Sequence, residues 1–140
     1  MIQIISGVKG SGKTKRLLDQ TNDALKVEHG DIVFIDDDKR YMYDLRHEIR
    51  FVDASAYPVA RGCSPDAFLA FISGMLAVNY DITLISIDAF LKLVHIDDPA
   101  ELSPFFAALD KLSQEHNCNF MVSVSMEVEK FPKDVLAYVQ

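Results

Sequence analysis

Eight residues close to the start of the chain have the types and the spacing that bind nucleotide phosphates. They match the pattern G-x-x-x-x-G-K-[ST] and are Gly7, Val8, Lys9, Gly10, Ser11, Gly12, Lys13 and Thr14. Glycines let the backbone curl so that several N–H groups converge on phosphate oxygens. The spacing places Lys13 against the β and γ phosphates and the hydroxyl of Thr14 against Mg²⁺. We therefore expect these eight residues and Lys15 to bind a nucleoside triphosphate, ATP or GTP, with Lys13 also acting in catalysis.

The segments on both sides of this loop have the order that a phosphate-binding loop requires. Residues 1–6 form a short β-branched run suited to a buried strand, and residues 13–26 carry Leu17, Leu18 and Leu25 at helical spacing. The loop thus leads from a strand into a helix, whose first turn adds free N–H groups and a positive dipole end. The alternative is a glycine-rich turn that matches the pattern by chance. Fewer chance matches would also have a strand before the loop and a helix after it.

A second element with chemistry is Asp88, which follows a mostly apolar run over residues 82–87. A buried strand that ends in Asp is the Walker B pattern, whose carboxylate holds Mg²⁺, often through a water ligand. We expect Thr14 and Asp88 to form the metal site and Asp88 to be catalytic. The alternative is that Asp88 caps the helix that follows it, and the two roles can coexist.

The composition sets the outer limits of what the chain can be. Its 140 residues, with 49% hydrophobic content, suit one domain that spans residues 1–140. Lys and Arg number 14 against 21 Asp and Glu, and the resulting net charge of −7 argues against broad nucleic-acid binding. Because no apolar run approaches the length of a membrane span and no basic leader precedes the first strand, we expect a cytoplasmic protein. Cys63, Cys118 and the four histidines lack metal-ligand spacing, which leaves them outside the expected site.

The remaining elements alternate between strands and helices. Further strands are predicted over residues 32–35, 51–52 and 119–125, and further helices from Pro65 and over residues 99–116 and 132–139. This alternation implies an α/β fold with a mostly parallel sheet of four or five strands and helices on both faces. The ligand is then expected at the carboxyl ends of the strands, where the glycine-rich loop and Asp88 both lie.

Residues 36–43 concentrate charge and aromatic side chains just past a predicted strand end. One interpretation is a solvated loop, which is what acidic runs usually are, and the other is a functional loop on the ligand face. Four arginines are available to stabilise phosphate charge, in their own subunit or in a neighbour's site: Arg40, Arg46, Arg50 and Arg61.

The whole chain resembles small bacterial P-loop ATPases of the type often labelled twitching-motility-like. The likeness is carried by residues 4–14, by residues 34–38 with Arg40 and Tyr41, and by residues 84–88. It implies a P-loop NTPase fold of the RecA/ASCE type, which places an extra strand between the P-loop and Walker B strands. Residues 7–88 also look like the layout of type II thymidine kinases, because residues 38–41 form an Asp-x-Arg-Tyr-like run.

The resemblance also shows which catalytic group is missing. In the RecA/ASCE class a Glu usually follows the Walker B Asp and orients the attacking water, whereas Ala89 and Phe90 follow Asp88 here. Some members of the class take this base from the second strand. Three carboxylates are candidates to replace it: Asp36, Asp37 and Glu127.

Two serines at the end of the last predicted strand occupy positions that carry a functional side chain in the resembled class. Ser123 and Ser125 lie where that class carries a polar sensor of the γ-phosphate. Alternatively, their hydroxyls are satisfied within their own strand end.

Three functions remain open on this basis. The first, which we favour, is a nucleotide-binding ATPase with slow or partner-dependent, Mg²⁺-dependent hydrolysis; the others are a nucleoside or small-molecule kinase and a non-catalytic nucleotide-gated switch. The first strand is expected at or near an exposed sheet edge unless residues 132–139 pack over it, and such an edge invites a homo-oligomer or a protein partner. The resemblance implies that Arg40 or Arg61 could complete a neighbouring subunit's site.

Overall fold

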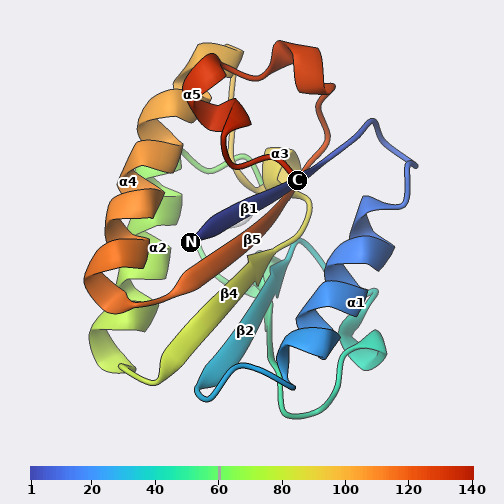
Figure 1. Ribbon diagram of the computed structural model, residues 1–140, viewed down its shortest axis with the longest axis vertical. Coiled ribbons are helices and arrows are strands. Elements are labelled where there is room, and N and C mark those ends of the chain that lie inside the picture. Colours follow the sequence, from blue (N-terminus) through green and yellow to red (C-terminus); the bar gives the residue numbers. More distant parts are fainter. Residues whose placement is uncertain (60) are drawn as a thin grey trace.

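A parallel five-stranded sheet forms the centre of the protein. The computed structural model describes residues 1–59 and 61–140, and the strands run in the order β1-β5-β4-β2-β3 (Figure 1). Every neighbouring pair is parallel, so the carboxyl ends of all strands meet at one edge. The strands are β1 (Ile2–Ser6), β2 (Asp31–Asp36), β3 (Arg50–Asp53), β4 (Ile82–Ile87) and β5 (Asn119–Val124).

Helices cover both faces of this sheet, as the alternating pattern predicts. Helix α1 (Lys13–Ala24) packs on one face, and α2 (Pro65–Val78) and α4 (Leu102–His116) lie side by side on the other (Figure 1). The predicted start of α2 is confirmed, because the Ser64 side chain accepts a hydrogen bond from the N–H of Ala67 at 3.1 Å. Together with the sheet, this arrangement confirms the α/β class.

The remaining helical segments are short. The segment after β4 contains α3 (Phe90–Leu93), which is too short to give a helical period in the sequence and was not predicted. The C-terminal helix α5 (Lys133–Leu136) is shorter than the predicted residues 132–139, and α1 ends two residues before Lys26. Single 3₁₀ turns occur at Met42–Asp44, Ala54–Ala56, Pro99–Glu101 and Val128–Lys130.

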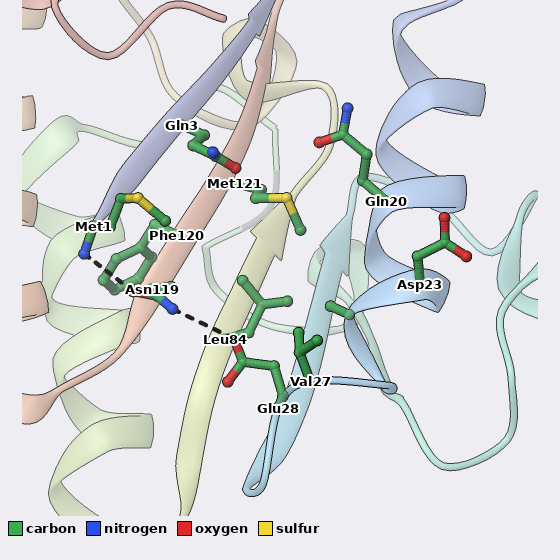
Figure 2. A pocket seen from close by; sticks show the side chains of 11 residues that line it. Met1, Gln3, Gln20, Asp23, Val27, Glu28, Leu84, Asn119, Phe120 and Met121 are labelled. Carbon is green, nitrogen blue, oxygen red and sulfur yellow. Dashed lines mark hydrogen bonds between the residues drawn. The ribbon is translucent and has the colours of Figure 1, made fainter.

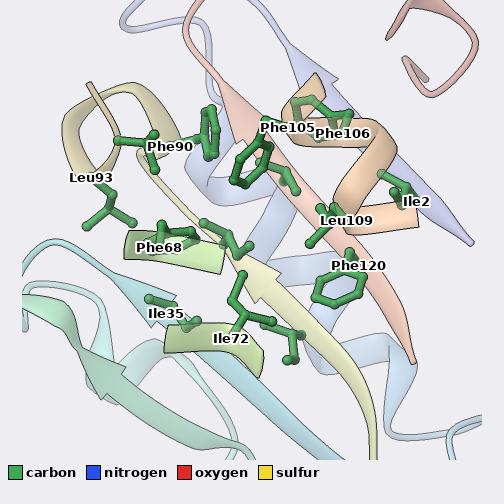
Figure 3. Packing of buried hydrophobic residues seen from close by; sticks show 14 of the residues in the cluster. Ile2, Ile35, Phe68, Ile72, Phe90, Leu93, Phe105, Phe106, Leu109 and Phe120 are labelled. Atoms are coloured by element: carbon green, nitrogen blue, oxygen red, sulfur yellow. The ribbon is translucent and has the colours of Figure 1, made fainter. Parts of the chain in front are cut away.

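An aromatic cluster fixes the segment that follows β4. Phe90 is fully buried, and its ring centroid lies 4.9 Å from that of Phe105 and 6.4 Å from that of Phe68 (Figure 3). Rings at these separations interact favourably beyond the area they bury. Because Phe90 comes two residues after Asp88, the cluster anchors the chain next to the expected metal ligand.

The first strand is the edge strand of the sheet, but part of its edge is covered. The N–H of Ile4 donates to the carbonyl of Tyr138 at 2.8 Å, and the N–H of Gln140 donates to the carbonyl of Ile4 at 2.9 Å. The residues after α5 therefore occupy hydrogen-bonding groups that would otherwise invite another strand. Within residues 1–59 and 61–140, no helix is both long and apolar enough to cross a membrane.

Candidate functional site

The loop between β1 and α1 is tightly curled. Gly7 and Gly12 adopt positive φ angles of 152° and 86°, which favour glycine. A Cβ atom on Gly7 would also collide with the side chain of Ser11. The glycines at these two positions therefore allow a backbone that other residues would strain.

The curl leaves several backbone donors free. Among the residues that the structure describes, the N–H groups of Gly10, Gly12, Lys13 and Thr14 donate no hydrogen bond, whereas Ser11 N–H donates to the Val8 carbonyl at 3.1 Å. These groups lie at the start of the twelve-residue helix α1, where the helix dipole adds positive potential. The loop can thus supply converging donors to an anion.

The lysine of the loop is folded inward. Lys13 is only 7% exposed, and its Nζ donates to the carbonyl of Val8 at 2.9 Å, across the loop. Burial lowers the pKa of its amine, and the charge of Asp88 opposes that shift. The ammonium group therefore lies inside the loop and near the Asp88 carboxylate.

Asp88 joins the loop to the neighbouring strands through hydrogen bonds. Its carboxylate accepts from Thr14 Oγ1 at 3.1 and 3.3 Å and from Ser123 Oγ at 2.6 Å. The Ser123 hydroxyl in turn accepts from the N–H of Ala89 at 3.0 Å. The two residues predicted as metal ligands are therefore in direct contact, and Ser123 contacts one of them.

The helix-capping alternative for Asp88 is wrong. The residue at the cap position of α3 is Ala89, and no side chain caps that helix. The Asp88 carboxylate instead faces Thr14 and Ser123. The capping alternative came from the frequency of Asp before helices, which does not say where this side chain points.

Asp36 lies beside Asp88 at the end of the next strand. Ile35 and Ile87 are paired across β2 and β4, so Asp36 and Asp88, the next residue in each case, lie at the same height along the two neighbouring strands. Asp36 is 1% exposed, its Oδ1 accepts from the N–H of Asp37 at 2.8 Å, and its Oδ2 has no hydrogen-bond partner among the described residues. Burial, and after it the charge of Asp88, raises the pKa of Asp36 to about 8. The Asp36 carboxyl is therefore largely neutral at pH 7 in the ligand-free protein.

This raised pKa predicts that Asp36→Asn stabilises the fold in a pH-dependent way. In the unfolded chain Asp36 ionises near its ordinary value of 3.8, whereas the folded protein keeps the proton up to about 8. Wild-type stability therefore falls as the pH rises between these values, and the asparagine variant escapes that loss. After a discount for relaxation around the charge, we expect a gain of about 1–3 kcal/mol in the free energy of unfolding at pH 8.

Urea denaturation of wild type and Asp36→Asn at pH 5 and pH 8 measures this difference. The gain should be clearly larger at pH 8 than at pH 5. The exposed Asp23→Asn on α1 serves as the control and should show no such trend. Equal stability differences at the two pH values would contradict the buried, proton-holding carboxyl.

A cleft of about 910 Å³ opens above these groups at the carboxyl ends of the strands. Its walls come from the glycine-rich loop, the first turns of α1, the residues after β2 and the start of α3. Of the sequence-predicted site residues, the cleft is lined by Lys9, Gly10, Gly12, Lys13, Thr14, Lys15, Asp36 and Asp88. Gly7 and Ser11 belong to the loop but do not line the cleft, and Val8 borders an adjacent hollow of about 370 Å³.

The other predicted candidates separate into those near the cleft and those away from it. Asp37, Arg40, Ser123 and Ser125 line it, so the loop after β2 lies on the same side of the sheet as the glycine-rich loop. Glu127 lines the adjacent hollow instead. Arg46 and Arg50 are exposed and do not line the cleft.

One contact at the cleft was not predicted from the sequence. Arg61 precedes α2, and its guanidinium lies 3.3 Å from Oδ2 of the buried Asp37. Arg40 also lines the cleft, 3.3 Å from Asp38. The loop before α2 therefore brings an arginine of the same chain to the end of β2, one of the two placements that the sequence left open.

Ala89 has a left-handed backbone, with φ 54° and ψ 44°. A left-handed backbone strains alanine by roughly 1 kcal/mol relative to glycine. Part of the gain from glycine is offset because glycine gives the unfolded chain more conformational entropy. We expect Ala89→Gly to raise the free energy of unfolding by about 0.5–1 kcal/mol. The control is Ala70→Gly inside α2, for which urea denaturation should show a free energy of unfolding about 1 kcal/mol lower, because glycine destabilises the interior of a helix. A loss of stability in Ala89→Gly would contradict strain at this position.

A different hollow, of about 310 Å³, lies at the opposite, amino-terminal end of the strands. Figure 2 shows Met1, Leu84 and Asn119 on its walls, with Asn119 donating to Glu28 at 3.3 Å. No loop with free N–H groups borders it among the residues that the structure describes. The chemistry-bearing residues are therefore gathered in the larger cleft.

Comparison with protein-family models gives no match, and a search of curated proteins finds none that is significantly similar to this chain. The chemistry of the site therefore rests on its residues and their geometry.

Proposed function

We propose that the protein binds a nucleoside triphosphate together with Mg²⁺ in the large cleft and hydrolyses it slowly. The observation that carries this proposal is the convergence of free N–H groups, the inward-facing Lys13 and the Thr14–Asp88 pair at one end of the cleft. Proteins often bind anions and cations at separate sites. The Mg²⁺ complex of a triphosphate instead requires phosphate-binding and metal-binding groups within a few ångströms of each other.

The strand order supports a P-loop NTPase fold of the RecA/ASCE type. Strand β5 lies between β1, which leads into the glycine-rich loop, and β4, which ends at Asp88. This is the extra strand of that class, and the resemblance to small bacterial P-loop ATPases agrees with it. Within this fold the residues 7–15 act as the P-loop.

The donor set fits Mg²⁺ bound with phosphate rather than a metal held by protein alone. In the described part of the chain, no three His, Cys, Asp or Glu side chains are grouped to hold a metal ion. Mg²⁺ usually takes one or two protein oxygens and completes its shell with phosphates and water, which Thr14 and Asp88 can satisfy. When bound, Mg²⁺ neutralises phosphate charge during transfer of the γ-phosphoryl group.

The chain's own groups would act on the phosphates directly. The free N–H groups of Gly10, Gly12, Lys13 and Thr14 would hold the β-phosphate. Lys13 would leave the Val8 carbonyl to contact the β and γ phosphates. Ser123, already bonded to Asp88, would orient that carboxylate. Since no Glu follows Asp88, turnover should be slow.

A binding titration next to a phosphate-release assay tests the proposal. Wild-type protein is titrated with ATP and with GTP in the presence of Mg²⁺, and inorganic phosphate is measured at several protein concentrations. Binding with slow release in the absence of any acceptor supports the ATPase, and a rate per molecule that rises with concentration indicates assembly. Binding without release favours a switch, and absence of binding overturns the proposal.

A further inference from the structure

We propose that Asp37 is the carboxylate that activates the attacking water, and that Arg61 of the same chain holds it in position. This inference rests on the proposed function, because it assigns the base of that reaction. It replaces the Glu that is missing after Asp88 with a residue from the end of β2.

Three other carboxylates of the cleft are engaged in hydrogen bonds or ion pairs, and a fourth, Asp44, is exposed in the 3₁₀ turn after β2. Asp88 accepts hydrogen bonds from Thr14 and Ser123. Asp38 accepts from the N–H of Arg40 at 2.8 Å and from its guanidinium, and Asp19 pairs with Lys15 at 2.9 Å on the exposed side of α1.

Asp36 is the closest competitor, and its surroundings make it a poor proton acceptor. It is buried beside Asp88, and no cation lies within ion-pair distance of it among the described residues. An ionised carboxylate at Asp36 would therefore be buried without a countercharge, next to the carboxylate of Asp88.

Asp37 differs from Asp36 in having a countercharge. It is 5% exposed and lines the cleft, and its Oδ2 lies 3.3 Å from the Arg61 guanidinium. The geometry of that contact does not make a hydrogen bond, so Oδ2 accepts none from any described residue. The guanidinium compensates a buried carboxylate charge at the wall of the cleft.

The backbone of Arg61 is tied to the segment that follows Asp88. Gly62, in a left-handed conformation with φ 79°, donates its N–H to the carbonyls of Lys92 and Leu93 at 3.0 and 3.1 Å. The N–H of Cys63 donates to the same Leu93 carbonyl at 3.1 Å. These bonds attach Arg61 to α3.

The same segment is attached to Asp88 at its other end. The N–H of Ala89 donates to Ser123, which donates to Asp88, and Phe90 anchors α3 in the aromatic cluster. The predicted metal ligand and the positioner of Asp37 therefore belong to one connected frame, and a partner subunit is not needed to place either.

The proposed step is hydrolysis of the bond between the β and γ phosphates. A water oxygen forms a bond to the γ-phosphorus, and the proton of that water passes to the Asp37 carboxylate. The bond from the γ-phosphorus to the β–γ bridging oxygen breaks, and its electron pair stays on the nucleoside diphosphate. Arg61 does not contact the reacting atoms and acts through Asp37.

The test measures affinity and chemistry separately in the full-length chain. Dissociation constants for Mg²⁺-ATP come from calorimetry, and single-turnover phosphate release gives the rate of the chemical step. We expect Asp37→Asn to bind within about threefold of wild type and to release phosphate about 10²-fold more slowly, the usual contribution of a general base. Arg61→Ala should slow release about 10-fold at unchanged affinity, and Arg61→Lys should recover part of the rate because it restores the cation.

Matched controls lie outside the cleft. Asp23→Asn on α1 and Arg50→Ala on β3 remove the same charges from exposed positions and should leave both quantities unchanged. Thermal unfolding confirms that each variant is folded. If Asp37→Asn does not fold, the two Arg61 variants decide, because equal release rates in Arg61→Ala and wild type overturn the inference.

The outcomes separate this inference from the proposed function. Wild type that does not bind Mg²⁺-ATP refutes both. Wild type that binds without releasing phosphate refutes the inference and leaves nucleotide binding standing. Asp37→Asn that hydrolyses at the wild-type rate, or that loses affinity as much as rate, overturns the role of Asp37 as a base.

Discussion

Lys13→Ala should weaken Mg²⁺-ATP binding by about 10²–10³-fold while the protein stays folded. Charge-assisted hydrogen bonds contribute roughly 1.5–3 kcal/mol each, and this ammonium group is placed to contact two phosphates. Among the described residues, its Nζ donates a hydrogen bond only to the Val8 carbonyl, within the loop itself. Removing it therefore deletes a ligand contact and a charge near Asp88, but no hydrogen bond between distant parts of the chain.

Calorimetric titration of wild type and Lys13→Ala with Mg²⁺-ATP measures this effect, and circular dichroism confirms folding. Lys26→Ala is the matched control, since Lys26 is an exposed lysine just past the other end of α1. Equal affinities in wild type and Lys13→Ala would exclude a phosphate role for this lysine.

Asp88→Asn should lower Mg²⁺-dependent turnover by about 10²–10³-fold and affect Mg²⁺-free nucleotide binding far less. The substitution keeps the shape of the side chain and one oxygen for Thr14 or Ser123, but it removes the charge that favours Mg²⁺. Removing the charge also ends a repulsion with Asp36, since Asp88 contributes to the raised pKa of that residue. A lower pKa of Asp36 in the variant would therefore accompany the loss of activity.

The measurement compares nucleotide affinity and phosphate release with Mg²⁺ and with EDTA in both proteins. A loss confined to the Mg²⁺ condition supports the metal role. An equal loss in EDTA would mean that Asp88 acts by organising Thr14 and Ser123 rather than by binding the metal.

The parts of this structure that the sequence predicts are those set by periodic or local signals. The β-branched run before the loop, the leucines of α1 and the stripe of α2 each follow from burial of one face, and the structure confirms these elements. The meeting of Thr14 with Asp88 follows from parallel strands whose carboxyl ends share one edge. Such signals give the class of fold and the location of the cleft.

The parts that escaped prediction depend on contacts between residues far apart in the chain. No local pattern indicates that Arg61 lies beside Asp37, because the contact depends on how Gly62 and Cys63 bind the carbonyl of Leu93. Helix α3 is too short for a hydrophobic period, and the left-handed Ala89 has no sequence signal of its own because most such positions are glycine. The proton on Asp36 likewise depends on burial beside Asp88, which the sequence does not reveal.

Residue-resolved amide measurements on adding Mg²⁺-ATP test the central claim most directly. The unbonded N–H groups of Gly10, Gly12, Lys13 and Thr14 should shift strongly in NMR spectra and become protected from hydrogen exchange, because phosphate oxygens would occupy them. Asp88 and Ser123 should shift only when Mg²⁺ is present. Changes confined to the hollow around Met1 and Asn119, or no change at millimolar Mg²⁺-ATP, would contradict a triphosphate site in this loop.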